Sequence, residues 1–209
     1  MNDYTTTIIR VGLLLAAFAI VATSIVSLTE ANTRDRISEN ERQTLLAAIN
    51  ALVGDNDYDN DILTDTLLIP GVRKLGTKDF TNVYRARKGS IPVAAVFTSI
   101  APNGYNGKIK LLVGVYYDGT LAGVRVIKHK ETPGLGDKIE VKKADWILQF
   151  KGLSLNSPTE SRWKVKKDGG DFDQFTGATI TPRAIVTAVK KALQYFEKNR
   201  DDLFKEAKK

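Results

Sequence analysis

The chain of 209 residues contains no cysteine, a single histidine (His129) and a single methionine. Without cysteine it forms no disulfide, and it offers no thiolate nucleophile and no cysteine ligand for zinc or an iron–sulfur cluster. One histidine also excludes a metal site built from several imidazoles. If the protein performs redox chemistry, other side chains must therefore hold an organic cofactor.

Positively charged residues only slightly outnumber negatively charged ones. Lysine and arginine number 31 and aspartate and glutamate number 24, which gives a formal net charge of +7. This balance suits nucleic acid, anionic lipid and phosphorylated ligands equally, so charge does not choose among them. Apolar residues make up 43% of the chain, which is enough to bury a core.

A long uncharged run, VGLLLAAFAIVATSIVSL, occupies residues 11–28. As an α-helix it reaches about 27 Å, just long enough to span the hydrocarbon core of a bilayer. No clean small-x-small cleavage site follows the run before Glu30, so we interpret the run as a retained anchor rather than a signal peptide. Basic residues lie on both sides of it, and their count does not fix its orientation.

The anchor divides the chain into residues 1–29 and a second part, residues 30–209. A helical stripe of apolar residues predicts a membrane-proximal helix from Thr33 to Val53 that ends at Gly54. The segment DNDYDND at 55–61 is interpreted as a solvated loop. It is not a calcium loop, because it lacks the glycine and the final glutamate that such a loop needs.

From Val83 to Lys130 the sequence is rich in strand-forming residues, and Asp118-Gly119 predicts a two-residue hairpin, so we expect an antiparallel sheet. Asp145 is predicted to cap a short helix. Thr181 and Pro182 are predicted to be the N-cap and the first residue of a final helix. Its apolar face contains Ile185, Val189, Leu193 and Phe196. The expected fold class is α+β.

Two glycine-rich segments stand apart: ETPGLGD at 131–137 and DGGDFDQFTGATITP at 168–182. Neither has the spacing of a Walker loop or of a dinucleotide fingerprint. From the residues alone, each is compatible with an ordinary chain reversal. The second segment also lies directly before a helix N-terminus, where free amides and the helix dipole favour a phosphate.

At residues 173–179, DQFTGAT resembles the Asp-x-x-[Ser/Thr]-Gly-Ala-Thr flavinylation motif of FMN-binding domains. ETPGLGDKIE, the stretch from Trp163 to Thr179 and the single anchor extend the likeness. Over essentially its whole length the chain is similar to the RnfG family, also called RsxG, of the Rnf (Rsx) ion-translocating electron-transport complex. Two glycine segments in this order are a far more specific signal than either one alone.

The resemblance implies FMN esterified through its phosphate to Thr179 by a separate flavin transferase. It further implies that the flavin transferase or its Mg²⁺ recognises Asp173. The resemblance indicates no catalytic residue and no metal ligand in this chain. The residues expected to position the phosphate are Thr176, Gly177 and Ala178. The residues expected to wall the flavin ring are Glu131, Thr132, Leu135 and Gly136.

The resemblance also implies a role, a place and partners. The role is electron transfer, without independent catalysis, in a membrane complex that couples ferredoxin and NAD chemistry to ion translocation. The place is the bacterial inner membrane, crossed once, with the main domain in the periplasm. The implied partners are the other subunits of the complex, the flavin transferase and membrane lipid, and no nucleic acid.

The residues themselves are also compatible with two other functions. One is a membrane-tethered sensor that holds a phosphorylated ligand reversibly. The other is the corresponding subunit of the sodium-pumping NADH:quinone oxidoreductase, which shares the motif, although the short chain and DGGDFDQF favour Rnf. His129 is interpreted as solvated or bonded within a loop, and Trp146 and Trp163 as core or rim aromatics. A solvated face of the last helix is expected to hold Lys190, Lys191 and Lys198.

Overall fold

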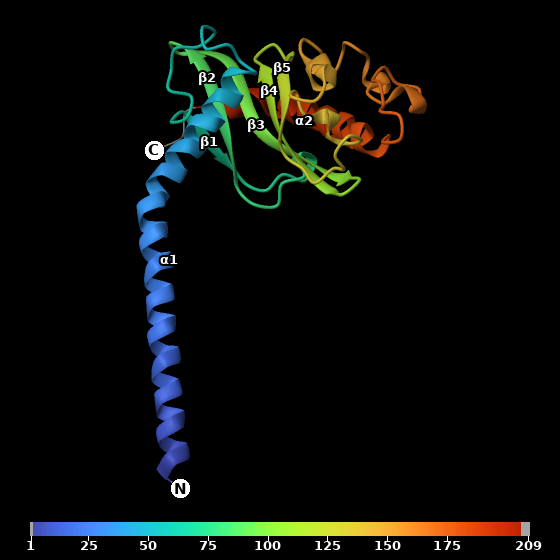
Figure 1. Ribbon diagram of the computed structural model, residues 1–209. Helices are drawn as coiled ribbons and strands as arrows, with labels where there is room; N and C mark the ends of the chain where they lie inside the picture. The colour runs from blue at the N-terminus through green and yellow to red at the C-terminus, as the bar shows by residue number, and fades with distance from the viewer. Residues whose placement is uncertain (1, 206–209) are drawn as a thin grey trace. The chain divides into compact units, whose positions relative to one another are not determined.

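The computed structural model describes residues 2–205, and the chain divides after Leu45 into two compact units. Helix α1 extends from Asn2 to Asn50, and its part up to Leu45 forms the first unit (Figure 1). Nearly all side chains of residues 11–28 are exposed, and among the described residues α1 is the one helix long and apolar enough to cross a membrane. This agrees with the predicted anchor.

The predicted membrane-proximal helix is not a separate element. Residues 33–50 continue α1 without a break, and residues 51–53 form a turn after it. The reason is local: no glycine or proline lies between Leu13 and Asn50, so nothing in the sequence interrupts the backbone hydrogen bonds. Residues 33–50 are helical as predicted, and they belong to the same helix as the uncharged run.

The second unit is built on a five-stranded antiparallel sheet in which sequence neighbours are spatial neighbours throughout. This arrangement confirms the sheet predicted from the strand-forming residues. The strands are β1 (Thr66–Ile69), β2 (Thr81–Lys88), β3 (Ile91–Gly104), β4 (Gly107–Tyr116) and β5 (Leu121–Lys128).

The hairpin between β4 and β5 turns at Asp118-Gly119 as predicted, with one residue more than expected. The Tyr116 amide donates to the Thr120 carbonyl at 2.8 Å, and the Gly119 amide donates to the Tyr116 carbonyl at 2.9 Å. Gly119 has φ of +94°, which only glycine adopts freely. The loop therefore comprises residues 117–119, the three-residue turn that ends in a left-handed glycine.

Helix α2 (Ile180–Phe204) lies across one face of the sheet (Figure 1). Ile185, Val189, Leu193 and Phe196 recur at helical spacing, and all four are buried, as the sequence predicted. They pack with the odd-numbered residues of β4, which share one face because side chains alternate along a strand. The sheet and α2 thus enclose the main core of the α+β unit.

Leu52 covers part of the opposite face of the sheet. A Cβ atom added to Gly114 would lie 3.3 Å from the Leu52 Cβ, and one added to Gly123 would lie 3.1 Å from the Leu52 Cδ2. Glycine at these positions lets the segment after α1 approach the sheet closely. Both faces of the sheet are therefore buried.

The connection from β5 to α2 contains only short 3₁₀ helices. These are η2 (Asp137–Ile139), η3 (Asp145–Phe150), η4 (Glu160–Arg162) and η5 (Lys166–Asp168); η1 (Arg73–Leu75) lies earlier, between β1 and β2. Asp145 does not cap η3. It lies inside the helix, Ala144 precedes it, and no side chain caps the helix end. A residue already in the helix is badly placed to bond the first amides.

Aromatic side chains fill the space under this connection. Phe150 stacks on Phe172 with ring centroids 5.1 Å apart and on Trp163 at 6.2 Å. Trp163 is 2% exposed, so it is the core aromatic that we expected. Trp146 is half-buried and meets the rings of Phe150 and Phe175 edge-on, which is the behaviour of a rim aromatic.

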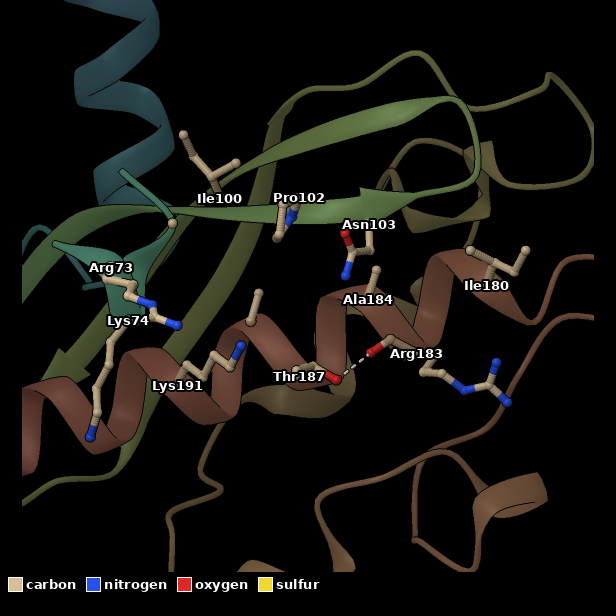
Figure 2. A pocket seen from close by; sticks show the side chains of 12 residues that line it. Arg73, Lys74, Ile100, Pro102, Asn103, Ile180, Arg183, Ala184, Thr187 and Lys191 are labelled. Atoms are coloured by element: carbon tan, nitrogen blue, oxygen red, sulfur yellow. Dashed lines mark hydrogen bonds between the residues drawn. The ribbon is translucent and has the colours of Figure 1, made fainter. Parts of the chain in front are cut away.

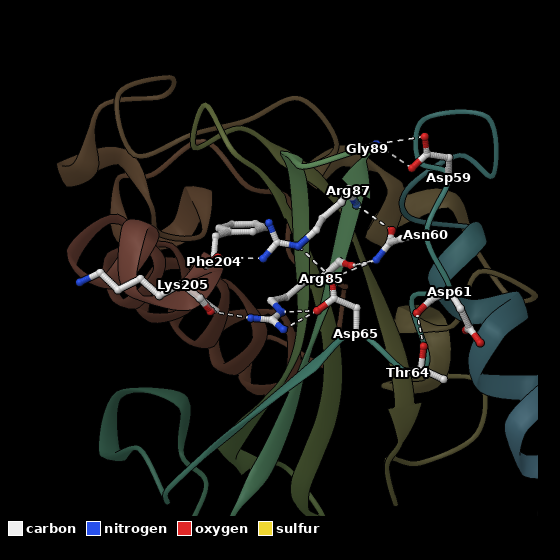
Figure 3. A network of polar contacts seen from close by, with 10 residues as sticks. All are labelled: Asp59, Asn60, Asp61, Thr64, Asp65, Arg85, Arg87, Gly89, Phe204 and Lys205. Carbon is white, nitrogen blue, oxygen red and sulfur yellow. Dashed lines mark hydrogen bonds and ion pairs between the residues drawn. The ribbon is translucent and has the colours of Figure 1, made fainter. Parts of the chain in front are cut away.

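The C-terminal end of α2 is bound by two arginines of β2 (Figure 3). Arg85 donates to the Lys205 carbonyl and Arg87 to the Phe204 carbonyl, each at 2.8 Å. Asp65 forms ion pairs with both arginines. We call Asn60, Asp65, Arg85 and Arg87 the Asp65 network. Asn60 belongs to the DNDYDND loop, so the loop is not simply solvated.

Candidate functional site

The two glycine-rich segments meet at one hollow of about 280 Å³. It lies between the β3–β4 hairpin, the loop after β5 and the start of α2. Its lining consists of Tyr105, Glu131, Thr132, Leu135, Gly136, Gly177, Ala178, Thr179, Ile180 and Thr181. The wall is part apolar and part polar, as in sites for small organic molecules.

Seven of the nine residues predicted for the site line this hollow. They are Glu131, Thr132, Leu135 and Gly136 from the first segment, and Gly177, Ala178 and Thr179 from the second. The other two, Asp173 and Thr176, do not line it. Three lining residues were not predicted as part of the site: Tyr105, Ile180 and Thr181. Tyr105 sits between two glycines in the turn of a hairpin, which is the one local signal that would have drawn attention to it.

The turn before α2 presents its glycine to the hollow. The Ala178 amide donates to the Phe175 carbonyl at 3.1 Å, and Gly177 has φ of +81°. A Cβ added to Gly177 would meet only the Leu135 Cδ2, at 3.9 Å. Glycine is needed here for the backbone conformation, and its lack of a side chain leaves the hollow open.

Helix α2 begins two residues earlier than predicted. Its first residue is Ile180 and its N-cap is Thr179, whose hydroxyl caps no amide of the helix. Pro182 brings no amide, so Ile180 and Thr181 supply the free amides of the first turn. The Thr179 hydroxyl therefore lies beside the positive end of the helix dipole without a capping role.

Thr181 is not the N-cap that the sequence predicted. It is fully buried, and its hydroxyl donates to the Glu131 carboxylate. A carboxylate is a stronger hydrogen-bond acceptor than a neutral oxygen. This one belongs to a residue fifty positions away in the sequence. No local pattern around Pro182 reveals such a partner.

The Glu131 carboxylate also receives two backbone amides of the β3–β4 hairpin. The Asn106 amide donates to Oε1 at 3.1 Å, and the Tyr105 amide donates to Oε2 at 3.3 Å. The residue is 5% exposed. Its charge is thus satisfied by three donors, as a buried carboxylate requires.

His129 is bonded within its loop, which is one of the two roles we expected for it. Its Nδ1 accepts the Glu131 amide at 3.0 Å, and its Nε2 lies 2.7 Å from the Glu140 Oε1. Because Nδ1 accepts, the proton of the neutral ring resides on Nε2 and is donated to Glu140. The ring thereby fixes the backbone at the start of the ETPGLG loop.

Asp173 lies outside the hollow with its carboxylate exposed. Its Oδ1 pairs with the Lys166 Nζ at 2.6 Å, and its backbone carbonyl accepts the Trp146 indole N–H at 2.8 Å. Thr176 is exposed as well. The aromatic cluster therefore holds this stretch by its backbone and leaves both side chains in solvent.

Arg183, in the first turn of α2, is held by Asp168. Its Nε and Nη2 donate to the two carboxylate oxygens at 2.6 and 2.8 Å. This bidentate bond lowers the pKa of the Asp168 carboxyl below its ordinary value. The cation at the start of α2 is therefore held in place by a carboxylate of the second glycine segment.

A second groove of about 270 Å³ lies on the other side of Ile180 (Figure 2). It is lined by Arg73 and Lys74 of η1, by Ile100 of β3 and by Lys191 of α2, among others. Sequence reasoning missed this groove. The lysine of α2 was expected on a solvated face, and only the fold brings η1 beside it.

Comparison with known proteins gives two family matches. Residues 104–194 match the FMN-binding domain, and residues 1–52 match the RnfG N-terminal region. A protein of Pseudoalteromonas atlantica, named as the subunit designated G of an ion-translocating oxidoreductase complex, is 48% identical over 92% of this chain and 90% of its own length. The chain belongs to the RnfG family.

Proteins of the same name in other species give the same result. The one from Shewanella oneidensis is 45% identical over 94% of this chain and 92% of its own length. The one from Vibrio cholerae serotype O1 is 46% identical over 95% of this chain and 94% of its own length. The hollow lies within the part of the chain that matches the FMN-binding domain, and the resemblance inferred from the motifs is confirmed.

Proposed function

We propose that the protein is the electron-carrying RnfG component of an Rnf-type ion-translocating oxidoreductase complex and that it holds FMN in the hollow beside Thr179. The observation that carries this proposal is the meeting of ETPGLG and TGAT at one site inside the FMN-binding match. In such a complex, ferredoxin and NAD chemistry is coupled to ion translocation. The protein itself performs no independent catalysis and serves as an electron carrier.

The residues at the hollow fit a flavin mononucleotide. The free amide of Ile180 and the helix dipole suit a phosphate, and Gly177 leaves room for it to approach. Leu135 and Ile180 are exposed apolar residues that both line the hollow, and they suit an aromatic ring system. When bound, FMN supplies one- and two-electron transfer, which no side chain of this cysteine-free chain offers.

Thr179 is our candidate for the covalent attachment point. Its hydroxyl is not used as a helix cap and lines the hollow, so it is available to form an ester with the FMN phosphate. Thr181 is a poor rival because its hydroxyl is buried and bonded to Glu131. Thr176 lies outside the hollow.

Asp173 is assigned to maturation rather than to flavin contact. A carboxylate beside a phosphate is repelled by it, and that of Asp173 points to solvent beside Lys166. There it is accessible to the flavin transferase or its Mg²⁺. Thr176 and Gly177 set the course of the turn that presents Thr179.

We further propose that α1 anchors the protein in the bacterial inner membrane as a single span, in contact with lipid, with the FMN-binding unit in the periplasm. The exposed apolar run of residues 11–28 supports the anchor. The partners are the remaining subunits of the complex and, during maturation, the flavin transferase.

The test is covalent flavin on the full-length chain produced together with a flavin transferase. We expect fluorescence on the band after denaturing electrophoresis and an FMN mass increment on the peptide that contains Thr179. Thr179→Ala abolishes both signals, and the matched Thr176→Ala variant keeps them. A non-fluorescent parent band indicates reversible ligand binding instead, and flavin on Thr176 or Thr181 refutes the assignment.

A further inference from the structure

The Glu131 carboxylate lies on the wall of the candidate flavin site, and its described bonds join parts of the chain to one another. We infer that Glu131 is a positioning residue that acts through the Thr181 hydroxyl. Together they hold the first turn of α2, and with it the Thr179 hydroxyl, in the place where the flavin phosphate becomes attached. This inference rests on the function proposed above.

The first support is the origin of the three donors. Two are the amides of Tyr105 and Asn106 in the β3–β4 hairpin, and the third is the Thr181 hydroxyl in α2. The carboxylate itself belongs to the ETPGLG loop. Three segments distant in sequence are therefore joined at two oxygen atoms of one buried side chain.

The second support is the room that the chain leaves for this carboxylate. A Cβ added to Gly104 would lie 2.8 Å from the Glu131 Oε1, and one added to Gly136 would lie 2.9 Å from Oε2. The same atom on Gly136 would lie 3.1 Å from the Thr181 Oγ1. Both glycines thus let the carboxylate reach its donors, and a larger residue at either position displaces it.

The third support is the position of Thr181 in the chain. It lies between Thr179 and Pro182, inside the first turn of α2. Helical backbone is disfavoured in the residue before a proline because the proline ring crowds it. The bond to Glu131 offsets this preference, so it holds the start of α2 and the threonine two residues earlier.

The contacts of Thr179 explain why the hydrogen bond between Thr181 and Glu131 matters for its position. Its hydroxyl has no capping bond of its own, so its place is set by the backbone on either side. Group transfer is sensitive to position, and a displacement of about 1 Å can slow a reaction by roughly a hundredfold. Loosening the first turn therefore slows the attachment of flavin more than it destabilises the fold.

The experiment measures the initial rate of covalent flavin gain on the full-length chain in the presence of a flavin transferase, with the melting temperature of each flavin-free variant. Thr181→Val removes the hydroxyl and keeps the shape of the side chain, whereas Thr181→Ser keeps the hydroxyl. Glu131→Gln removes the charge. Asp65→Ala serves as a control, because it destabilises the other end of α2.

We expect Thr181→Val and Glu131→Gln to slow flavin gain by about tenfold, consistent with a displaced acceptor. Thr181→Ser keeps the parent rate. The double variant is no slower than Thr181→Val alone, because Thr181→Val has already removed the bond through which Glu131 acts on α2. Asp65→Ala lowers the melting temperature and leaves the rate within about twofold, well below the effect of misplacing the acceptor.

Two results overturn the inference while the proposed function stands. In the first, the parent chain gains flavin and Thr181→Val gains it equally fast. In the second, Asp65→Ala slows flavin gain as much as Thr181→Val, so that the rate follows stability alone. A parent chain that gains no flavin refutes the proposed function and this inference together. If Glu131→Gln does not fold, the comparison of Thr181→Val with Thr181→Ser still tests the inference.

Discussion

Removing the Asp65 carboxylate should destabilise the FMN-binding unit more than any exposed ion pair does. In Asp65→Ala, Arg85 and Arg87 lose their shared counter-ion. They are also the residues that bind the last carbonyls of α2 (Figure 3). Two largely buried guanidinium groups then keep their carbonyl partners but lose the carboxylate that neutralises them.

The magnitude follows from burial. Removing one partner of a buried ion pair costs about 3–5 kcal/mol. The side chains of Arg85, Arg87 and Asp65 keep exposed fractions of 9%, 15% and 21%, so some water reaches the pair. We therefore expect the lower end, about 3 kcal/mol. For a domain of this size that corresponds to a fall of about 6–12 °C in melting temperature.

The assay is thermal or urea unfolding of the full-length protein in detergent, followed by tryptophan fluorescence. Trp146 and Trp163 are the only tryptophans of the chain, and both belong to the unit that contains the sheet. Their signal reports the unfolding of that unit, whereas circular dichroism also records α1. Asp65→Asn, which keeps an acceptor oxygen but no charge, should fall between the alanine variant and the parent.

The matched control is Asp171→Ala. Asp171 pairs with Arg162, and the two side chains are 41% and 50% exposed. An exposed pair of this kind contributes about 0–1 kcal/mol. If Asp65→Ala and Asp171→Ala lower the unfolding free energy by equal amounts, solvent screens the Asp65 network and our reasoning fails.

Three further predictions concern the site. Asp173→Ala should reduce covalent flavin while the unfolding free energy stays within about 0.5 kcal/mol of the parent, because an exposed carboxylate supports no core; full loading would contradict its role. Gly136→Ala should lower stability by about 1–3 kcal/mol in a melting experiment, because the added methyl group meets Glu131, and an unchanged melting temperature would contradict this. By NMR titration, the pKa of Asp168 should lie below its ordinary value and rise towards it in Arg183→Gln. The stabilisation from this exposed pair is complete above the ordinary carboxyl pKa and is lost as the pH falls through the lowered one, and an unshifted pKa refutes the bond.

The sequence by itself determined the elements whose signals are local. The uncharged run of residues 11–28 specifies an apolar helix, because most of its side chains favour hydrocarbon over water and none is charged. The strands and the turn at Asp118-Gly119 follow from alternation and from the left-handed conformation of glycine. The buried face of α2 follows from helical spacing. The two glycine segments were recognisable as motifs before their meeting place was known.

Tertiary structure alone decided which partners the polar groups chose. Thr181 has the sequence features of an N-cap, yet its hydroxyl donates to Glu131 because the fold brings a buried carboxylate to it. Arg85 binds a carbonyl 120 residues away at the end of α2. Hydrogen bonds and ion pairs depend on distance in space, whereas periodicity records only distance along the chain. The hydrogen bonds of Glu131 can therefore be recognised only when the β3–β4 hairpin, the ETPGLG loop and α2 are seen together in the folded structure.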